Sequence, residues 1–161
     1  MKAYVTKACC WAMVAWIGLG TVSAAPVVDT TRQGVQAYAQ QDYERARRML
    51  ASAAEAGNGR ALFHLGRMHS RGHGVEPNQK RASRLFLQAA KAGFGRAQAV
   101  IAARYMDGRG VARDDIAAYR WLTAAARQGN RQARKLRDQH LAERMDAQQL
   151  RRARERITDL P

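Results

Sequence analysis

Apolar and polar positions in the middle of the chain repeat with a period of thirty-six residues. Residues 57–92 and residues 93–128 align at this spacing without a gap. In the first half of the earlier stretch, Ala61, Leu65 and Met68 follow one another at steps of four and three, so they share one face of a helix. The second half has helical spacing again, in both stretches, at alanine, leucine and aromatic positions: Ala82, Leu85, Phe86, Ala89 and Ala90, then Ala118, Trp121, Leu122, Ala125 and Ala126. Each unit is therefore predicted to be a pair of helices.

Asx and glycine residues mark the ends of the predicted helices. Asp42, Asn78 and Asp114 stand thirty-six residues apart, just before each second helix, where their side-chain oxygens can accept from free backbone N–H groups. Glycines at the same period follow the second helices and can close them in a left-handed conformation; these are Gly57, Gly93 and Gly129. The stretch "SRGHGVEPN" keeps its glycines and valine in "DGRGVARDD" one period later, while His73 becomes Arg109. It is therefore interpreted as a tight corner between helices.

The ends of the repeat region differ from its middle. Residues 25–56 lack the Gly-x-Gly-Val corner and turn more tightly at "AQQDY", so they are expected to form an N-terminal helix pair. Residues 129–161 begin as a half-repeat and end in a further helix with a narrow apolar stripe, formed by Leu150, Ala153, Ile157 and Leu160. A stack of repeats needs its last apolar face covered, which favours a capping helix. The alternative is a basic helix on a membrane surface.

The start of this last helix carries a capping signature. Asp146 and Gln149 have the spacing of a capping box, and Met145 with Leu150 can form the accompanying hydrophobic staple.

These residues resemble the Sel1-like repeat, a relative of the tetratricopeptide (TPR) repeat. Residues 57–92 match its pattern in "GNGRA", "LGRMHSRGHGV", "NQKRASRL" and "AA", and residues 93–128 match it in "GFGRA", "IAARYMDGRGV", "DDIAAYRW" and "AA". The departures from the pattern are His69 for tyrosine, Asn78 for aspartate, Leu85 for tryptophan and Ala102 for glycine. The resemblance implies an all-α fold: a right-handed superhelix, or α-solenoid, of antiparallel helix pairs. It would contain two full repeats, a TPR-like helix pair before them, and a half-repeat with a capping helix after them.

The chain opens with the features of a secretory signal peptide. Lys2 and Lys7 precede the apolar run Ala8–Gly20, and "TVSA" supplies small residues before a cut after Ala24. The apolar run has 13 residues, too few for the roughly 20 that span a bilayer. Cleavage would remove residues 1–24 with both cysteines and leave a periplasmic or secreted protein without thiol chemistry.

The chain is strongly basic. Its formal net charge is +15, and loss of Lys2 and Lys7 lowers it to +13. The cations are mostly arginine and are spread along the chain without one dense basic block. The charge favours acidic partners such as anionic glycan or lipid, or it belongs to a solvated surface. Export argues against nucleic acid as a partner.

The sequence contains no recognisable catalytic or metal-binding constellation. The four histidines lie at positions 64, 69, 73 and 140, and no carboxylate is placed to complete a metal site with them. No serine lies in a Gly-x-Ser-x-Gly context, and the glycine-rich corners lack the spacing and lysine of a phosphate-binding loop. Asp114 and Asp115 are adjacent carboxylates that a helix start explains. We therefore expect no enzyme, cofactor or metal.

The predicted partner-binding residues lie on the first helix of each unit, which lines the concave surface in this architecture. They are the non-core positions of that helix: Arg60, Phe63, His64, Arg67, Arg96, Val100, Arg131 and Arg134. Arginines beside an apolar strip suit a partner segment that carries carboxylates.

The leading hypothesis is a periplasmic, non-enzymatic protein-interaction module: an adaptor, scaffold or regulator that binds a protein partner on its concave surface. One alternative is a binder of anionic cell-envelope polymer through the arginine-rich surface. A third is an enzyme acting on peptidoglycan or β-lactams.

Overall fold

The computed structural model of the protein describes residues 27–155 and 157 of the 161-residue chain. The expected signal peptide, residues 1–24, and Leu160 of the predicted apolar stripe lie outside the described residues. Every regular element among the described residues is a helix, with no strand. The all-α prediction is therefore confirmed for this part of the chain.

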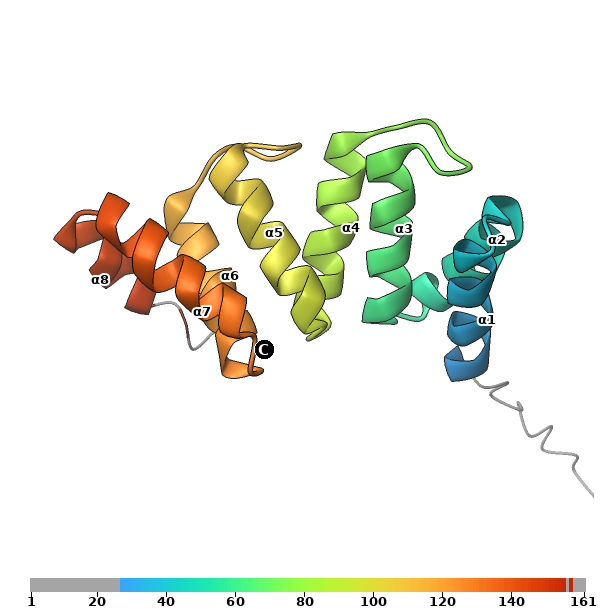
Figure 1. Cartoon of the computed structure of the whole chain (residues 1–161), viewed down its shortest axis with the longest axis horizontal. Helices are drawn as coiled ribbons and strands as arrows, with labels where there is room; N and C mark the ends of the chain where they lie inside the picture. The colour runs from blue at the N-terminus through green and yellow to red at the C-terminus, as the bar shows by residue number, and fades with distance from the viewer. Residues whose placement is uncertain (1–26, 156, 158–161) are drawn as a thin grey trace, which may run out of the picture.

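The helices follow one another as antiparallel pairs in an arched row, from α1 and α2 at one end to α8 at the other (Figure 1). From α1 to α7, each helix contacts the next one along the chain; α1 also contacts α3, and α8 contacts α6. The helices are α1 Val27–Ala39, α2 Tyr43–Glu55, α3 Gly59–Arg71, α4 Gln79–Lys91, α5 Gly95–Asp107, α6 Asp115–Arg127, α7 Arg131–Leu136 and α8 Ala147–Glu155. One π-helical turn, Arg137–Leu141, and one 3₁₀ turn, Ala142–Arg144, join α7 to α8.

The first six helices each have 13 residues. Side-chain caps begin α2, α3, α4 and α6, whereas Phe94 precedes α5 without such a cap. The predicted N-caps Asp42, Asn78 and Asp114 accept from the backbone N–H three residues on, at 3.2, 2.8 and 2.9 Å. The predicted left-handed glycines after α2, α4 and α6 have φ of +78°, +81° and +86°. Two further caps, Asn58 and Asn130, begin α3 and α7 in the same way. These local predictions are confirmed.

Each glycine-rich corner packs against the preceding unit. Gly74 has φ +67°, and a β-carbon there would collide with Tyr43 at the start of α2. Gly110 has φ +72°, and a β-carbon there would collide with the backbone carbonyl of Gln79 at the start of α4. Glycine is needed at both positions for its left-handed backbone and for the close approach.

Small residues let the helices approach closely, while larger side chains fill the spaces between layers. Ala46, Ala61, Ala82, Ala89, Ala90, Ala97, Ala102, Ala118 and Ala125 have no exposed surface. The large buried side chains include Leu50, Met68, Ile101 and Leu122. Fully burying a side chain of this size stabilises the fold by about 1.5–3 kcal/mol. The buried residues form two clusters that meet at α3, one reaching back to α1 and the other forward to Ile157.

Helix α8 covers the last repeat, as the sequence predicts. It contacts α6, and Ala153 and Ile157 of its apolar stripe are buried, while Leu150 packs against the same core. Gln149 N–H donates to Asp146 at 2.7 Å and Asp146 N–H donates to Gln149 at 3.0 Å, which confirms the capping box. The described part of the stripe packs against the repeats, so it does not form an exposed apolar face for binding a membrane surface.

Candidate functional site

The eight predicted partner-binding residues fall into three groups in the structure. Arg60, Arg96, Arg131 and Arg134 are exposed, and Arg67 and Val100 are half-buried. Phe63 and His64 are each only 8% exposed. The prediction that these two occupy non-core positions is wrong.

Phe63 and His64 are buried because α3 packs against helices on both sides. The Phe63 ring lies 5.5 Å from that of Phe86 on α4 and 5.2 Å from that of Phe94 before α5. The His64 ring meets Tyr38 of α1 edge-on at 5.6 Å. A helix with neighbours on two sides buries a wider arc than the narrow stripe of Ala61, Leu65 and Met68 suggests, and Leu65 itself is only half-buried.

The burial of His64 makes it a neutral ring rather than a cationic one. Its Nδ1 has no hydrogen-bond partner within the described structure. Burial, which has the largest effect, and the nearby charges of Arg67, Arg60 and Arg96 together lower the pKa of His64 to about 4. Three of the predicted arginines therefore lie close enough to this ring to act on its charge.

A groove between α3 and α5 brings several of the predicted residues together. We call it the α3–α5 groove; its volume is about 310 Å³. The apolar wall of the groove consists of Phe63, Phe86 and Val100. The polar lining consists of Arg67, Ser70, Arg71, Arg104 and Arg109. A groove of this size, at the small end of ligand-binding cavities, accepts side chains of a partner segment rather than a whole domain.

Arg104, which the sequence analysis did not single out, is the buried member of this lining. It is 6% exposed and its guanidinium carbon lies 4.8 Å from the centre of the Phe86 ring. Its Nη2 donates to Ser70 Oγ at 2.6 Å, and its Nη1 donates to Ser83 Oγ at 3.0 Å and to Gln79 Oε1 at 3.2 Å. Burial lowers the pKa of Arg104, with a smaller effect from Arg109, but a guanidinium remains charged in proteins.

A signal for Arg104 was present in the sequence. It stands thirty-six residues after Met68, which the periodicity places on the apolar face of its helix. A cation at the position of a core methionine breaks the pattern of apolar residues, and such breaks occur at functional or strained sites.

The groove is electropositive because four arginines line it and no acidic residue does. Arg67 lies 5.1 Å from the centre of the Tyr38 ring, and Arg109 lies 3.9 Å from the exposed carboxylate of Asp107. Among the described residues, Arg67 and Arg71 have no ion pair. The lining therefore offers charged donors to an anionic group.

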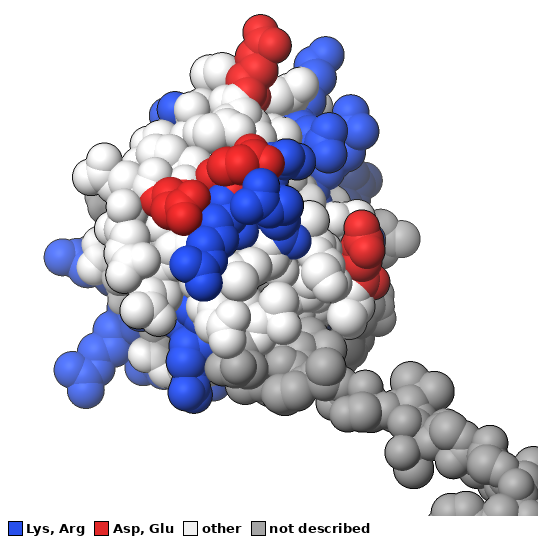
Figure 2. Space-filling view, turned by 90° about the vertical axis from the view of Figure 1, so that its right-hand side faces the viewer, with Lys and Arg blue, Asp and Glu red and all other residues white. Residues whose placement is uncertain are grey.

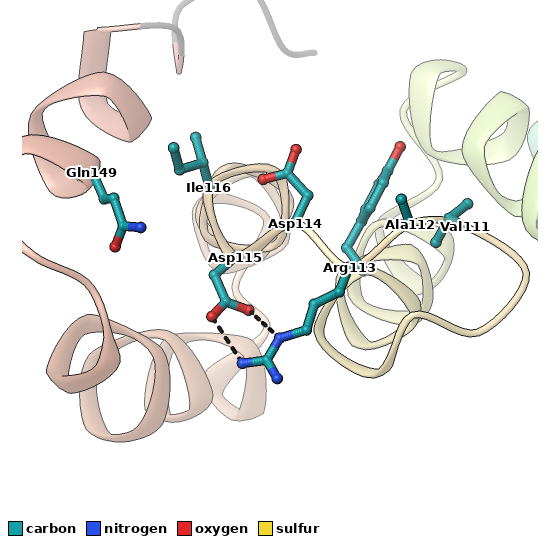
Figure 3. A pocket seen from close by; sticks show the side chains of 8 residues that line it. Val111, Ala112, Arg113, Asp114, Asp115, Ile116 and Gln149 are labelled. Atoms are coloured by element: carbon teal, nitrogen blue, oxygen red, sulfur yellow. Dashed lines mark hydrogen bonds and ion pairs between the residues drawn. The ribbon is translucent and has the colours of Figure 1, made fainter.

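A wider hollow of about 680 Å³ lies where the second corner meets α8, and it includes the adjacent carboxylates (Figure 3). Both carboxylates already have structural partners. Asp114 Oδ1 accepts from the Ala117 N–H at 2.9 Å, and Asp115 Oδ2 lies 3.2 Å from Arg113 and 3.3 Å from Arg144. The carboxylates here hold a helix end and two arginines, which is the helix-start role the sequence suggests.

The remaining predicted residues and histidines lie apart from the α3–α5 groove. Arg131 and Arg134 line a separate hollow of about 270 Å³ at the start of α7. His73 Nδ1 forms a hydrogen bond of 2.9 Å with the Tyr38 hydroxyl, and its ring stacks on Tyr43. His73 therefore joins the first corner to α1 and α2. Among residues 27–155 and 157, no three metal-binding side chains converge.

None of the helices in the described part of the chain combines the length and the apolar character needed to cross a bilayer.

The sequence profile described as Sel1 repeat matches three consecutive stretches, residues 33–58, 59–94 and 95–130. A Sel1 repeat protein from Oxalobacter formigenes has a similar structure, with a TM-score of 0.64 and 33% identity over 70% of this chain and 87% of that one. A comparison with curated proteins found no match.

A second solved structure shares the architecture. It is a protective antigen present in uropathogenic Escherichia coli strains that displays an SLR fold, with a TM-score of 0.77 and 24% identity over 84% of this chain. This chain spans 30% of the antigen's length, and the likeness shows the fold alone.

Proposed function

Because the chain belongs to the Sel1 repeat family, we propose that it is an exported, non-catalytic module that binds a protein partner in the α3–α5 groove. Sel1 repeat proteins generally mediate protein–protein interactions. The observation that carries the proposal is the groove itself, where first helices of successive repeats present Arg67 and Arg71 beside the apolar Val100. Arginine side chains next to apolar side chains are typical of the residues that contribute most to binding at protein interfaces.

Export is supported by the signal-peptide pattern of residues 1–24. A periplasmic location would place the groove among envelope proteins, with the chain acting as an adaptor, scaffold or regulator. Cell fractionation checks this part: we expect the processed protein, shortened at Ala24, in the periplasm or medium. Recovery of the unprocessed chain from the cytosol would contradict it.

The face at the N-terminal end of the stack favours a protein partner over an anionic polymer. Figure 2 shows acidic side chains interspersed with arginine and lysine on this face, not one continuous positive surface. Glu44 at the start of α2 pairs with Arg47 at 2.8 Å and with Arg48 at 3.2 Å. Polymer binding relies on an extended field of one sign, which such local pairing interrupts.

Site-specific photo-cross-linking in the producing cells tests the proposal. A photoreactive phenylalanine analogue replaces Val100 in the groove, and in a matched control it replaces the exposed Gln88 on α4. We expect a discrete protein adduct from position 100 and none from position 88. Equal adducts from both positions, or no adduct from position 100, would contradict binding in the groove.

A further inference from the structure

The charge on Arg104 is not neutralised within the described structure. Its guanidinium is buried, yet the acceptors around it are all neutral: the hydroxyls of Ser70 and Ser83, the side chain of Gln79 and backbone carbonyls. An isolated buried charge is unfavourable, and proteins normally pair it with an opposite one. The neutral acceptors satisfy its hydrogen bonds but supply no negative charge.

The repeat unit can be built without a cation at this position. The equivalent residue one repeat earlier is Met68, which is fully buried and fills its layer with apolar atoms. An arginine in place of a core methionine adds a desolvation cost, and its contacts with α3 and α4 bring it no negative charge. A ligand that carries the missing negative charge would compensate for this desolvation cost.

The other arginines of the groove point to more than one negative charge. Arg67, Arg71 and Arg109 line the same 310 Å³ groove as Arg104, and no carboxylate of the described chain lines it. A single chain terminus or a single phosphate would supply one anionic group to four cations. A segment with several carboxylates matches them better, and guanidinium groups bind carboxylates through paired hydrogen bonds.

The apolar wall identifies what accompanies the carboxylates. Phe63, Phe86 and Val100 line the groove next to the arginines. A recessed groove between two helices accepts an extended segment whose apolar side chains pack on the half-buried Val100, behind which the largely buried Phe63 and Phe86 lie. A flat membrane surface would meet only the exposed arginines. A peptide satisfies both the charged and the apolar lining.

We propose that the α3–α5 groove recognises an acidic segment of the protein partner in which aspartate or glutamate residues alternate with apolar residues, and that Arg104 is the buried charge that selects it. This inference rests on the proposed function and specifies the chemistry of the partner. Arg67 and Arg71 bind carboxylates at the rim, and Arg104 contributes its field from the floor of the groove.

A comparison of two end-capped octapeptides tests this inference. The first peptide alternates glutamate with leucine, and the second has glutamine in place of each glutamate. Both are bound to the protein purified from cells that express the full chain. Calorimetry should show the glutamate peptide binding about tenfold more tightly, the effect of one to two charge-assisted contacts. Nuclear magnetic resonance should place the largest shifts at Ser70 and at the side-chain signals of the groove arginines.

Matched variants separate the groove from general charge. Arg104→Met removes the buried charge, and Arg84→Gln removes one exposed charge from α4 outside the groove. Arg67→Gln with Arg71→Gln tests the rim independently of any folding defect in the buried variant. Its control is Arg84→Gln with Lys91→Gln, which removes two exposed charges outside the groove. We expect a loss of about fivefold or more in affinity for both groove variants and no comparable loss for either control.

Three outcomes would overturn the inference. Equal binding of the two peptides, or equal losses in groove and control variants, would remove acid selection. Arg104-dependent binding of phosphatidylglycerol vesicles without peptide binding would assign the groove to lipid. In the first two cases a cross-linked partner at position 100 would still support protein binding, so the two proposals fail separately.

Discussion

Tyr38 and His73 lie on neighbouring repeats, and the Tyr38 hydroxyl is 2.9 Å from His73 Nδ1. The two rings lie 5.7 Å apart, and His73 also stacks on Tyr43 with ring centres 4.8 Å apart. In the next corner the equivalent of His73 is Arg109, whose backbone carbonyl accepts from Ser83. The two corners thus share a backbone conformation, but different side chains join each corner to the preceding unit.

We predict that Tyr38→Phe lowers the free energy of unfolding by about 1 kcal/mol, because it removes one partly buried hydrogen bond. Chemical denaturation measures the change. A double-mutant cycle with His73→Ala isolates the pair, and a coupling energy near zero would show that the hydrogen bond does not hold the corner.

Gly110→Ala should destabilise the protein by about 3 kcal/mol or more. The position has φ +72°, and the added β-carbon collides with the Gln79 carbonyl and with Ser83. Gly93→Ala is the matched control, since its φ is +81° but nothing lies within 4 Å of the added carbon. Its cost should be about 1–2 kcal/mol, from the backbone alone. Similar losses in the two variants, measured by denaturant titration, would argue against a close approach at the corner.

His64 should make stability depend on pH between about 6.5 and 4. Burial and the charges of Arg67, Arg60 and Arg96 lower its folded-state pKa to about 4, while the unfolded chain takes up the proton near 6.5. The neutral ring therefore contributes on the order of 3 kcal/mol to the free energy of unfolding. This contribution is fully present above pH 6.5 and is lost as the pH falls towards 4.

Denaturation curves recorded across this pH range check the effect. The variant His64→Phe should flatten the dependence, whereas His140→Gln, which removes an exposed imidazole, should leave it intact. Persistence of the full slope in His64→Phe would assign the dependence to other groups.

Arg104→Met should not lower the melting temperature and should raise it if the buried charge is a net cost. Methionine reproduces the residue found at Met68, and Ser83 keeps its own 2.7 Å hydrogen bond to the Arg109 carbonyl. Replacing a buried charge with a well-packed apolar side chain is commonly neutral or stabilising by 1–4 kcal/mol. Thermal unfolding followed by circular dichroism measures the change. A drop of several degrees would show that Arg104 is structural and would weaken its assignment to ligand binding.

The sequence by itself determined the elements and their order. The thirty-six-residue period, the caps at Asp42, Asn78 and Asp114, and the capping box at Asp146 are local signals. Each acts through hydrogen bonds within a few residues of its own position. For this reason they could be predicted without knowing how the helices pack.

Only the tertiary structure decided which residues form the surface. Phe63 and His64 were expected among the partner-binding positions, but α1, α4 and the residues before α5 cover them. Arg104 of α5 holds a core position in the repeat, yet it lines the groove because α3 and α4 bring Ser70, Gln79 and Ser83 to its guanidinium. Exposure is a property of neighbouring helices in the stack, so the periodicity of one helix alone could not determine it.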